Sequence, residues 1–163
     1  MNNSENNNNL ICVIPARGGS KGIARKNLVD LGGKKLLAWT IEAALKSEMF
    51  DRVIVSTEDE EIANAAKDLG AEVPFIRPSN LASDEVHAVH VIFHALDWIY
   101  KKDNSTPDGV MMLLPTSPFR SYVDIRNSVE IFNSGHDAVI GVVDLGKYMT
   151  NLRYMDKNTL KVV

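Results

Sequence analysis

The sequence contains little cysteine and no long apolar run. Cys12 is the only cysteine, which excludes an internal disulfide and a zinc site built from thiolates, and its apolar neighbours favour a buried strand position. No stretch reaches the roughly 18 apolar residues that a membrane helix needs, and the N-terminus lacks the basic and apolar regions of a secretory signal. We therefore expect a cytoplasmic protein that does not contact a membrane.

Acidic residues are missing between Glu5 and Asp30, in a chain whose net charge is −3. The overall negative charge argues against nucleic-acid binding. Four cations fall within the acid-free stretch, namely Arg17, Lys21, Arg25 and Lys26. A small anionic ligand fits this local positive charge better than a nucleic-acid duplex does.

The composition predicts one globular domain preceded by a short tail. A chain of 163 residues, 45% hydrophobic and 24% charged, is long enough to close one core of ordinary size. Residues 1–9 are rich in asparagine and poor in apolar side chains, so burial cannot offset the entropy of ordering them. We expect a disordered polar tail over 1–9 and a folded domain over 10–146.

Short apolar segments alternate with amphipathic ones along the domain. Short apolar runs are typical of strands covered on both faces, and the other segments have helical spacing. The expected strands are 10–14, 52–55, 72–75, 109–114 and 138–143, and the expected helices are 36–47, one ending near 69, 85–101 and 121–133. The alternation predicts an α/β fold with a mostly parallel sheet, helices on both faces, and ligands bound beyond the carboxyl ends of the strands.

Polar residues mark the expected helix starts. Thr57 with Glu60 predicts a capping box, and the acidic run 58–61 suits a solvated helix N-terminus better than a metal site. Ser83-Asp84 resembles an N-cap for the following helix, in addition to any ligand contact. Ser121 is the expected start of the last helix.

The segment 15–27, directly after the first strand, carries a functional signal. Gly18, Gly19 and Gly22 allow backbone N–H groups to approach a phosphate, and four cations lie among them. The Gly-x4-Gly-Lys-Ser/Thr spacing of a P-loop and the Gly-x-Gly-x-x-Gly dinucleotide pattern are both absent. A basic glycine loop in this place predicts a nucleotide or phosphate site, with a solvated mobile loop as the alternative.

Four segments resemble the signature of the acylneuraminate cytidylyltransferases. They are Ile14-Pro-Ala-Arg-Gly-Gly-Ser-Lys-Gly22 with Lys26-Asn27, Ile54-Val-Ser-Thr57, Arg77-Pro-Ser-Asn-Leu-Ala-Ser-Asp84 and Pro115-Thr-Ser-Pro-Phe-Arg120, within residues 10–145. The resemblance implies a Rossmann-like nucleotide-diphospho-sugar transferase fold, a homodimer and Mg2+ as cofactor. The implied reaction transfers CMP from CTP to the anomeric hydroxyl of a sialic-type nonulosonic acid and releases pyrophosphate.

The resemblance also implies roles for single residues. Arg17 and Lys26 correspond to cations at the phosphates, where they would stabilise the charge that develops as the sugar hydroxyl attacks the α-phosphorus. Asn27 corresponds to a contact with the cytosine. The implied nucleotide-binding residues are Ala16, Arg17, Gly18, Gly19, Ser20, Lys21, Asn27, Arg77, Ala82 and Ser83. The implied sugar-side residues are Pro115, Thr116, Ser117 and Arg120.

Some of these residues also have purely structural explanations. A basic loop is often a solvated surface, so we assign Arg25 to solvent and leave Lys21 open. Asn27 could cap the next element, and Arg77 could be held by a helix C-terminus. Leu114 stands where many relatives have a glutamine that contacts the sugar, which leaves the identity of the sugar open.

Two further patterns concern metal ions. His87, His90 and His94 share one face of the expected helix 85–101, but a structural zinc site normally needs four ligands, so we expect no metal site there. The chain also has no Asp-x-Asp pair, which holds Mg2+ late in the resembling family. No metal-binding residue can therefore be assigned.

The end of the chain departs from the family pattern. Residues 147–163 correspond to the start of the arm that forms the dimer and contacts the sugar, and we expect that arm to be truncated. Two alternatives stay open: a nucleotidyltransferase for another sugar, and a non-catalytic nucleotide-binding fragment.

Overall fold

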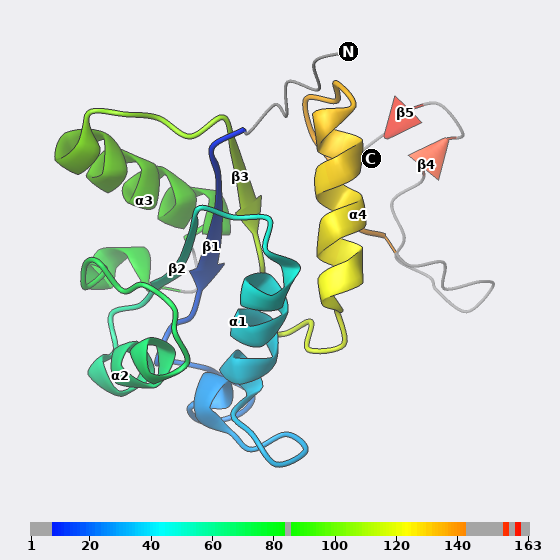
Figure 1. Cartoon of the computed structure of the whole chain (residues 1–163). Coiled ribbons are helices and arrows are strands. Elements are labelled where there is room, and N and C mark those ends of the chain that lie inside the picture. Colours follow the sequence, from blue (N-terminus) through cyan, green and yellow to red (C-terminus); the bar gives the residue numbers. More distant parts are fainter. Residues whose placement is uncertain (1–7, 84–85, 143–154, 157–158, 161–163) are drawn as a thin grey trace.

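The computed structural model describes residues 8–83, 86–142, 155–156 and 159–160 (Figure 1). The elements in chain order are β1 (Leu10–Pro15), a 3-10 helix (Lys26–Leu28), α1 (Leu36–Ser47), β2 (Arg52–Ser56), α2 (Glu60–Asp68), a 3-10 helix (Ser79–Leu81), α3 (Ala88–Asp103), β3 (Gly109–Met112), α4 (Tyr122–Asn133), β4 (Met155–Asp156) and β5 (Thr159–Leu160). None of the helices in these parts of the chain is long and apolar enough to span a membrane.

The main sheet has three parallel strands in the order β2-β1-β3. Cys12 on the central strand lies opposite Val53 on one side and Met111 on the other. The prediction that Cys12 is a core residue is confirmed, because its side chain is fully buried. Burial also raises the pKa of its thiol.

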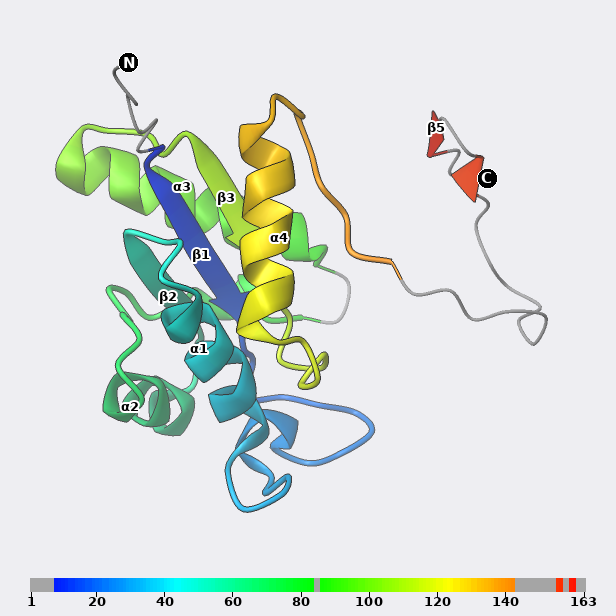
Figure 2. The ribbon, with the colours of Figure 1, turned by 45° about the vertical axis from the view of Figure 1, so that its right-hand side comes forward.

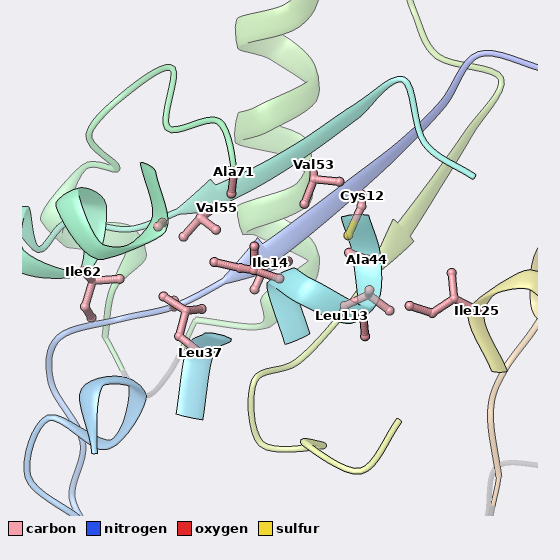
Figure 3. Close-up of a cluster of buried hydrophobic side chains, with 14 residues drawn as sticks. Cys12, Ile14, Leu37, Ala44, Val53, Val55, Ile62, Ala71, Leu113 and Ile125 are labelled. Carbon is pink, nitrogen blue, oxygen red and sulfur yellow. The ribbon is translucent and has the colours of Figure 1, made fainter. Parts of the chain in front are cut away.

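Helices cover both faces of this sheet, as the alternation of elements predicts. On one face Ile14 packs with Leu37 of α1, Ile62 of α2 and Ile125 of α4 (Figure 3). On the other face the alternate residues of the pleat, Ile11 and Val13 of β1 and Ile54 of β2, pack with Ala95 and Ile99 of α3. Turning the molecule shows α1 and α4 in front of the strands and α3 behind them (Figures 1 and 2). The α/β prediction with a parallel sheet and helices on both faces is confirmed.

Two helices match their predicted bounds closely. The 36–47 helix is confirmed at both ends as α1. Ser121 is confirmed as the N-cap of α4: its hydroxyl accepts from the N–H of Asp124, and the Asp124 carboxylate accepts from the N–H of Ser121. The carboxylate of Asp124 accepts from both the N–H and the hydroxyl of Ser121, and these bonds lower the pKa of the Asp124 carboxyl. A side-chain capping box starts α4, whereas α1 follows Lys35 without a side-chain cap.

Two predicted strands are wrong. Residues 72–75 contribute only one bridge, between Glu72 and Ile54, because the backbone then turns away to place Arg77 at the end of β2. Residues 138–142 form no strand among the described residues, and Val143 lies outside them. Residues 137–141 instead line a groove of about 730 Å³ together with β3 and Phe132.

Two predicted helix starts also need correction. Asp59 and not Thr57 is the N-cap of α2: its carboxylate accepts from the N–H of Ile62, while the Thr57 hydroxyl accepts from the N–H of Asp59. The helix α2 begins at Glu60, so Asp59 directly precedes it. Ile62 is then the third residue of the helix, whose N–H an N-cap side chain can accept from. The helix expected from residue 85 begins at Ala88, with His87 at the N-cap, so Ser83-Asp84 does not cap it. Residues 84–85 lie outside the described parts.

The two ends of the predicted domain plan are described only in part. Asn8 and Asn9, the last residues of the expected tail, hydrogen-bond to Asn133 and Asp108. Residues 1–7 lie outside the described parts. Of the expected arm over 147–163, only the antiparallel pair β4 and β5 is described.

Candidate functional site

The candidate site lies at the carboxyl ends of the strands, where three loops leave the sheet. The N–H of Ala16 donates to the oxygen of Ser56 at 3.0 Å, which extends the pairing of β1 and β2 by one residue. The N–H of Arg77 donates to the oxygen of Thr57 at 2.8 Å, so the 77–83 segment starts beside the end of β2. The loop after β3 leaves from the same edge because the strands are parallel.

The first loop, residues 16–27, is closed by a buried amide. The side chain of Asn27 is 6% exposed, and its Nδ2 donates to the backbone oxygen of Arg17 at 2.9 Å. Arg25 adopts a left-handed backbone conformation with φ of 50°, which turns the chain into the short 3-10 helix at Lys26. The amide of Asn27 thus joins the two ends of the loop, a structural role that differs from the cap considered above.

A pocket of about 230 Å³ opens between the first loop and the 77–83 segment. Four residues that the family resemblance assigns to the nucleotide line it together: Arg17, Arg77, Ala82 and Ser83. The remaining lining is apolar, from Pro15, Leu81, Val86, Ala88 and Val91. A largely apolar pocket whose lining includes two arginines suits a flat organic ring that carries anionic groups.

Arg77 forms part of the floor of this pocket. It is 3% exposed, and its Nη2 donates to Oε2 of Glu58 at 2.6 Å. Its Nε is buried without a hydrogen-bond partner among the described residues. The suggestion that a helix C-terminus holds Arg77 is wrong, because a carboxylate side chain does so.

Glu58 is the site residue that the sequence did not reveal. Its Oε1 accepts from the N–H of Gly18 at 2.7 Å, and its side chain is 20% exposed. We predicted a solvated helix N-terminus for the run 58–61, which is confirmed for Glu60 and Glu61, exposed in the first turn of α2 after the cap Asp59, but not for Glu58. Nothing in the local pattern distinguishes Glu58, since its partners lie in two distant segments.

Arg25 of the first loop pairs with acidic residues at the start of α2. Nη2 of Arg25 pairs with Asp59 and with Glu61, each at 2.8 Å, although the Arg25 side chain is 45% exposed. Partial burial of Asp59 disfavours its charge, but the hydrogen bonds from Arg25 and from the N–H of Ile62 outweigh that effect and lower its pKa. Arg25, which we assigned to solvent, therefore also ties the first loop to the start of α2.

The sugar-side segment lies apart from this pocket. Nη2 of Arg120 donates to the backbone oxygen of Leu114 at 3.1 Å, which closes the turn between them. Its Nη1 is buried without a partner among the described residues, and burial lowers the pKa of the guanidinium. None of Pro115, Thr116, Ser117 and Arg120 is among the residues that line the pocket.

Gly19 and Lys21 are exposed on the first loop, while Ser20 and Lys26 are half-buried.

The described residues contain no cluster of side chains that could hold a metal ion. No group of three or more histidine, cysteine, aspartate or glutamate side chains converges within the parts of the chain that are described. The two acids nearest the first loop are already engaged, Glu58 by Gly18 and Arg77, and Asp59 by Ile62 and Arg25. His94 packs its ring edge-on against Phe75, with centroids 4.6 Å apart. The residues present therefore do not form the convergent carboxylate set expected for a Mg2+ site.

The sequence matches a known protein family over the part of the chain that contains the sheet and the three loops. The family model for cytidylyltransferase covers residues 11–146. The chain belongs to the cytidylyltransferase family. Its residues at the pocket and on the three loops all fall within the matched range.

Curated relatives in this family carry names of three sugar acids. The pseudaminic acid cytidylyltransferase of Campylobacter jejuni is 41% identical over 75% of this chain and 52% of the relative. The CMP-N,N'-diacetyllegionaminic acid synthase of Legionella pneumophila is 40% identical over 82% of this chain and 57% of the relative. The N-acylneuraminate cytidylyltransferase of Escherichia coli is 40% identical over 90% of this chain and 34% of the relative. The chain thus spans about half the length of the first two and about a third of the last.

Solved structures share the fold. A CMP:2-keto-3-deoxy-manno-octonic acid synthetase, solved with CTP, superimposes with a TM-score of 0.64 at 22% identity, over 78% of this chain and 48% of that one. The Rv0371c protein of Mycobacterium tuberculosis, solved with manganese, gives a TM-score of 0.52 at 15% identity, over 78% and 61% of the two chains. These likenesses show that the chain shares the fold of both structures.

Proposed function

We propose that this chain carries the CTP-binding part of an enzyme that transfers CMP to the anomeric hydroxyl of a nonulosonic acid. The carrying observation is the gathering of Arg17, Arg77, Ala82 and Ser83 around one pocket at the carboxyl ends of β1 and β2. Family membership supports CTP as the nucleotide. The names of the relatives support a sialic-type acid as the acceptor.

In the proposed reaction the anomeric hydroxyl gives up its proton to solvent, its oxygen forms a bond to the α-phosphorus of CTP, and the bond from that phosphorus to the oxygen that bridges to the β-phosphorus breaks. Negative charge then gathers on the phosphoryl oxygens and on the leaving pyrophosphate. Arg17 and Lys26 supply preplaced positive charge, which stabilises that charge more in the transition state than in the ground state. The neighbouring backbone of Ala16, Gly18, Gly19 and Ser20, with Lys21, completes the proposed phosphate contacts.

The remaining assignments concern the base and the sugar. Asn27, Arg77, Ala82 and Ser83 are proposed to contact the nucleoside, and Pro115, Thr116, Ser117 and Arg120 to form the sugar side. A divalent cation, Mg2+ in our proposal, would need carboxylates outside the described residues, so no step here depends on it. We further propose a cytoplasmic enzyme that acts as a homodimer and binds neither nucleic acid nor membrane.

Nucleotide binding is testable on this chain directly. At a hundredfold excess over its dissociation constant, CTP should stabilise the fold by about 2.7 kcal/mol, measured by thermal denaturation. ATP and GTP should stabilise it less, because the pocket is proposed to select the cytosine. Equal stabilisation by the three nucleotides would contradict the cytidine assignment.

Transfer requires a second assay. Pyrophosphate release should be followed with CTP and, in turn, pseudaminic, N,N'-diacetyllegionaminic and N-acetylneuraminic acid. Release with one acid above the others would identify the acceptor. Protection by CTP with no release from any acid would instead support a nucleotide-binding module, the alternative favoured by the missing carboxylate cluster among the described residues.

A further inference from the structure

Glu58 links the first loop to the 77–83 segment, and residues of both segments line the pocket. Its Oε1 accepts from the backbone N–H of Gly18 at 2.7 Å, and its Oε2 accepts from Nη2 of Arg77 at 2.6 Å. Gly18 belongs to the first loop, and Arg77 lines the pocket from the loop after β2. One carboxylate therefore spans the distance between the glycine loop and a pocket-lining guanidinium.

The charge of Arg77 makes this link strong. A guanidinium that is 3% exposed has lost most of its hydration, so it depends on the carboxylate that replaces water. Glu58 is the ion-pair partner of Arg77, at 2.6 Å. Hydrogen bonds between ionised groups are stronger and more directional than those between neutral groups. The position of Glu58 is thereby set by Arg77, and the loop backbone follows Glu58.

Asp59, the residue after Glu58, also restricts the path of the first loop. A Cβ atom on Gly18 would lie 2.5 Å from Oδ2 of Asp59, so the loop backbone passes directly against the start of α2. Asp59 is itself fixed there as the N-cap that accepts from Ile62. Two consecutive carboxylates, each held by a separate partner, thus define the path of the backbone at Gly18.

We propose that Glu58 is a positioning residue of the nucleotide site, which sets the place of the glycine loop relative to Arg77. The N–H of Gly18 is then committed to the protein, and Gly18 serves the site through the close approach of its backbone. This inference rests on the proposed function, because it takes the pocket to be the place where CTP binds. Glu58 touches neither the nucleotide nor the reacting atoms.

The test compares two matched substitutions, Glu58→Gln and Glu72→Gln. Both remove a carboxylate from an arginine, but Glu72 pairs with Arg52, which does not line the pocket, whereas Glu58 pairs with Arg77, which does. Glu58→Gln turns an amide NH2 toward one of two donors, so the affinity for CTP should fall about tenfold, as expected for the loss of one charge-assisted hydrogen bond. Trypsin should also cleave the ligand-free variant faster after Arg17 and Lys21. Glu72→Gln should keep the CTP affinity and the cleavage rate of the original chain.

A third variant covers the case in which Glu58→Gln does not fold. Glu58→Asp keeps a charge near Arg77 but is one methylene shorter, so it cannot reach both partners; CTP affinity should fall while the melting temperature stays close to that of the original chain. Unchanged CTP affinity and unchanged cleavage in the folded Glu58 variants would overturn the positioning role and leave the proposed function intact. Absence of CTP binding by the original chain would defeat the proposed function, while the cleavage rates would still decide whether Glu58 positions the loop.

Discussion

The side chain of Asn27 reaches back across the first loop and donates to the backbone oxygen of Arg17 at 2.9 Å. The loop between these residues contains every glycine of the basic segment. Its two ends are thus joined by one buried amide, and its middle is exposed. The loop is consequently fixed where it meets the pocket and open where a triphosphate would approach.

Asn27→Ala should destabilise the fold by about 1–3 kcal/mol, because it leaves the oxygen of Arg17 without this donor. The measurement is urea unfolding at neutral pH. Asn8→Ala serves as the control, since it removes an exposed hydrogen bond to Asn133 and should change the stability by less than about 0.5 kcal/mol. Equal effects of the two substitutions would show that the loop closure contributes nothing.

Gly18→Ala should weaken CTP binding and destabilise the chain by about 1–3 kcal/mol. The added methyl group would lie 2.5 Å from Oδ2 of Asp59, so either the loop or the start of α2 must shift. Gly22→Ala is the matched control, because a Cβ there meets nothing within 4 Å and Gly22 is not among the proposed nucleotide contacts. CTP titration and thermal denaturation of both variants test this, and equal affinities would refute the steric argument.

The free energy of unfolding should decrease as the pH is lowered through the titration of His94. Burial lowers the pKa of His94 in the folded chain, and nearby Arg77 adds to the effect, so the unfolded chain takes up a proton first as the pH falls below about 6.5. The contribution of His94 is therefore complete above that pH and is lost as the pH falls toward the folded pKa. Urea midpoints at about pH 7.5 and 5.5 should differ less in His94→Leu than in the original chain. His136→Gln, which changes an exposed ring, should leave the difference unaltered.

Arg17→Ala and Lys26→Ala should each cost about 2–4 kcal/mol of transition-state stabilisation in the whole enzyme. The reason is the loss of positive charge near the departing pyrophosphate. Steady-state rates of pyrophosphate release measure it, with melting temperatures as a check on folding. Lys101→Ala, which removes an exposed cation of α3 paired with Asp97, is the control. Turnover equal to that of the control would make both residues surface charges.

The parts of the fold that the sequence predicted well depend on local chemistry. The helix over 36–47 and the capping box at Ser121 are decided by side chains within a few residues of each other. The predictions for 72–75 and 138–143 failed because an apolar run cannot say whether a partner strand will lie beside it. At Thr57 and Asp59, two good capping residues competed, and only the path of the chain toward Ile62 separated them.

The candidate site also has residues that the sequence predicted and one that it did not. Glycines and cations after the first strand pointed to the first loop, and Arg17, Arg77, Ala82 and Ser83 do line one pocket. Their roles stay predictions. Glu58 could not be found, because its importance comes from Gly18 and Arg77, which are far from each other in the sequence. In the sequence Glu58 is one of four consecutive acidic residues, and nothing local marks it as the one that bonds to Gly18 and Arg77.

The central strand β1 is synthesised first but receives its second neighbour late. Leu10 pairs with Gly109, and Asn9 exchanges hydrogen bonds with Asp108. A ribosome must therefore make the whole stretch up to β3 before both edges of β1 can be covered. Until then one edge of a strongly apolar strand is available to other nascent chains, and exposed edges of this kind are sites of aggregation. The strand that carries the first loop is thus the part of the protein that most needs protection during translation.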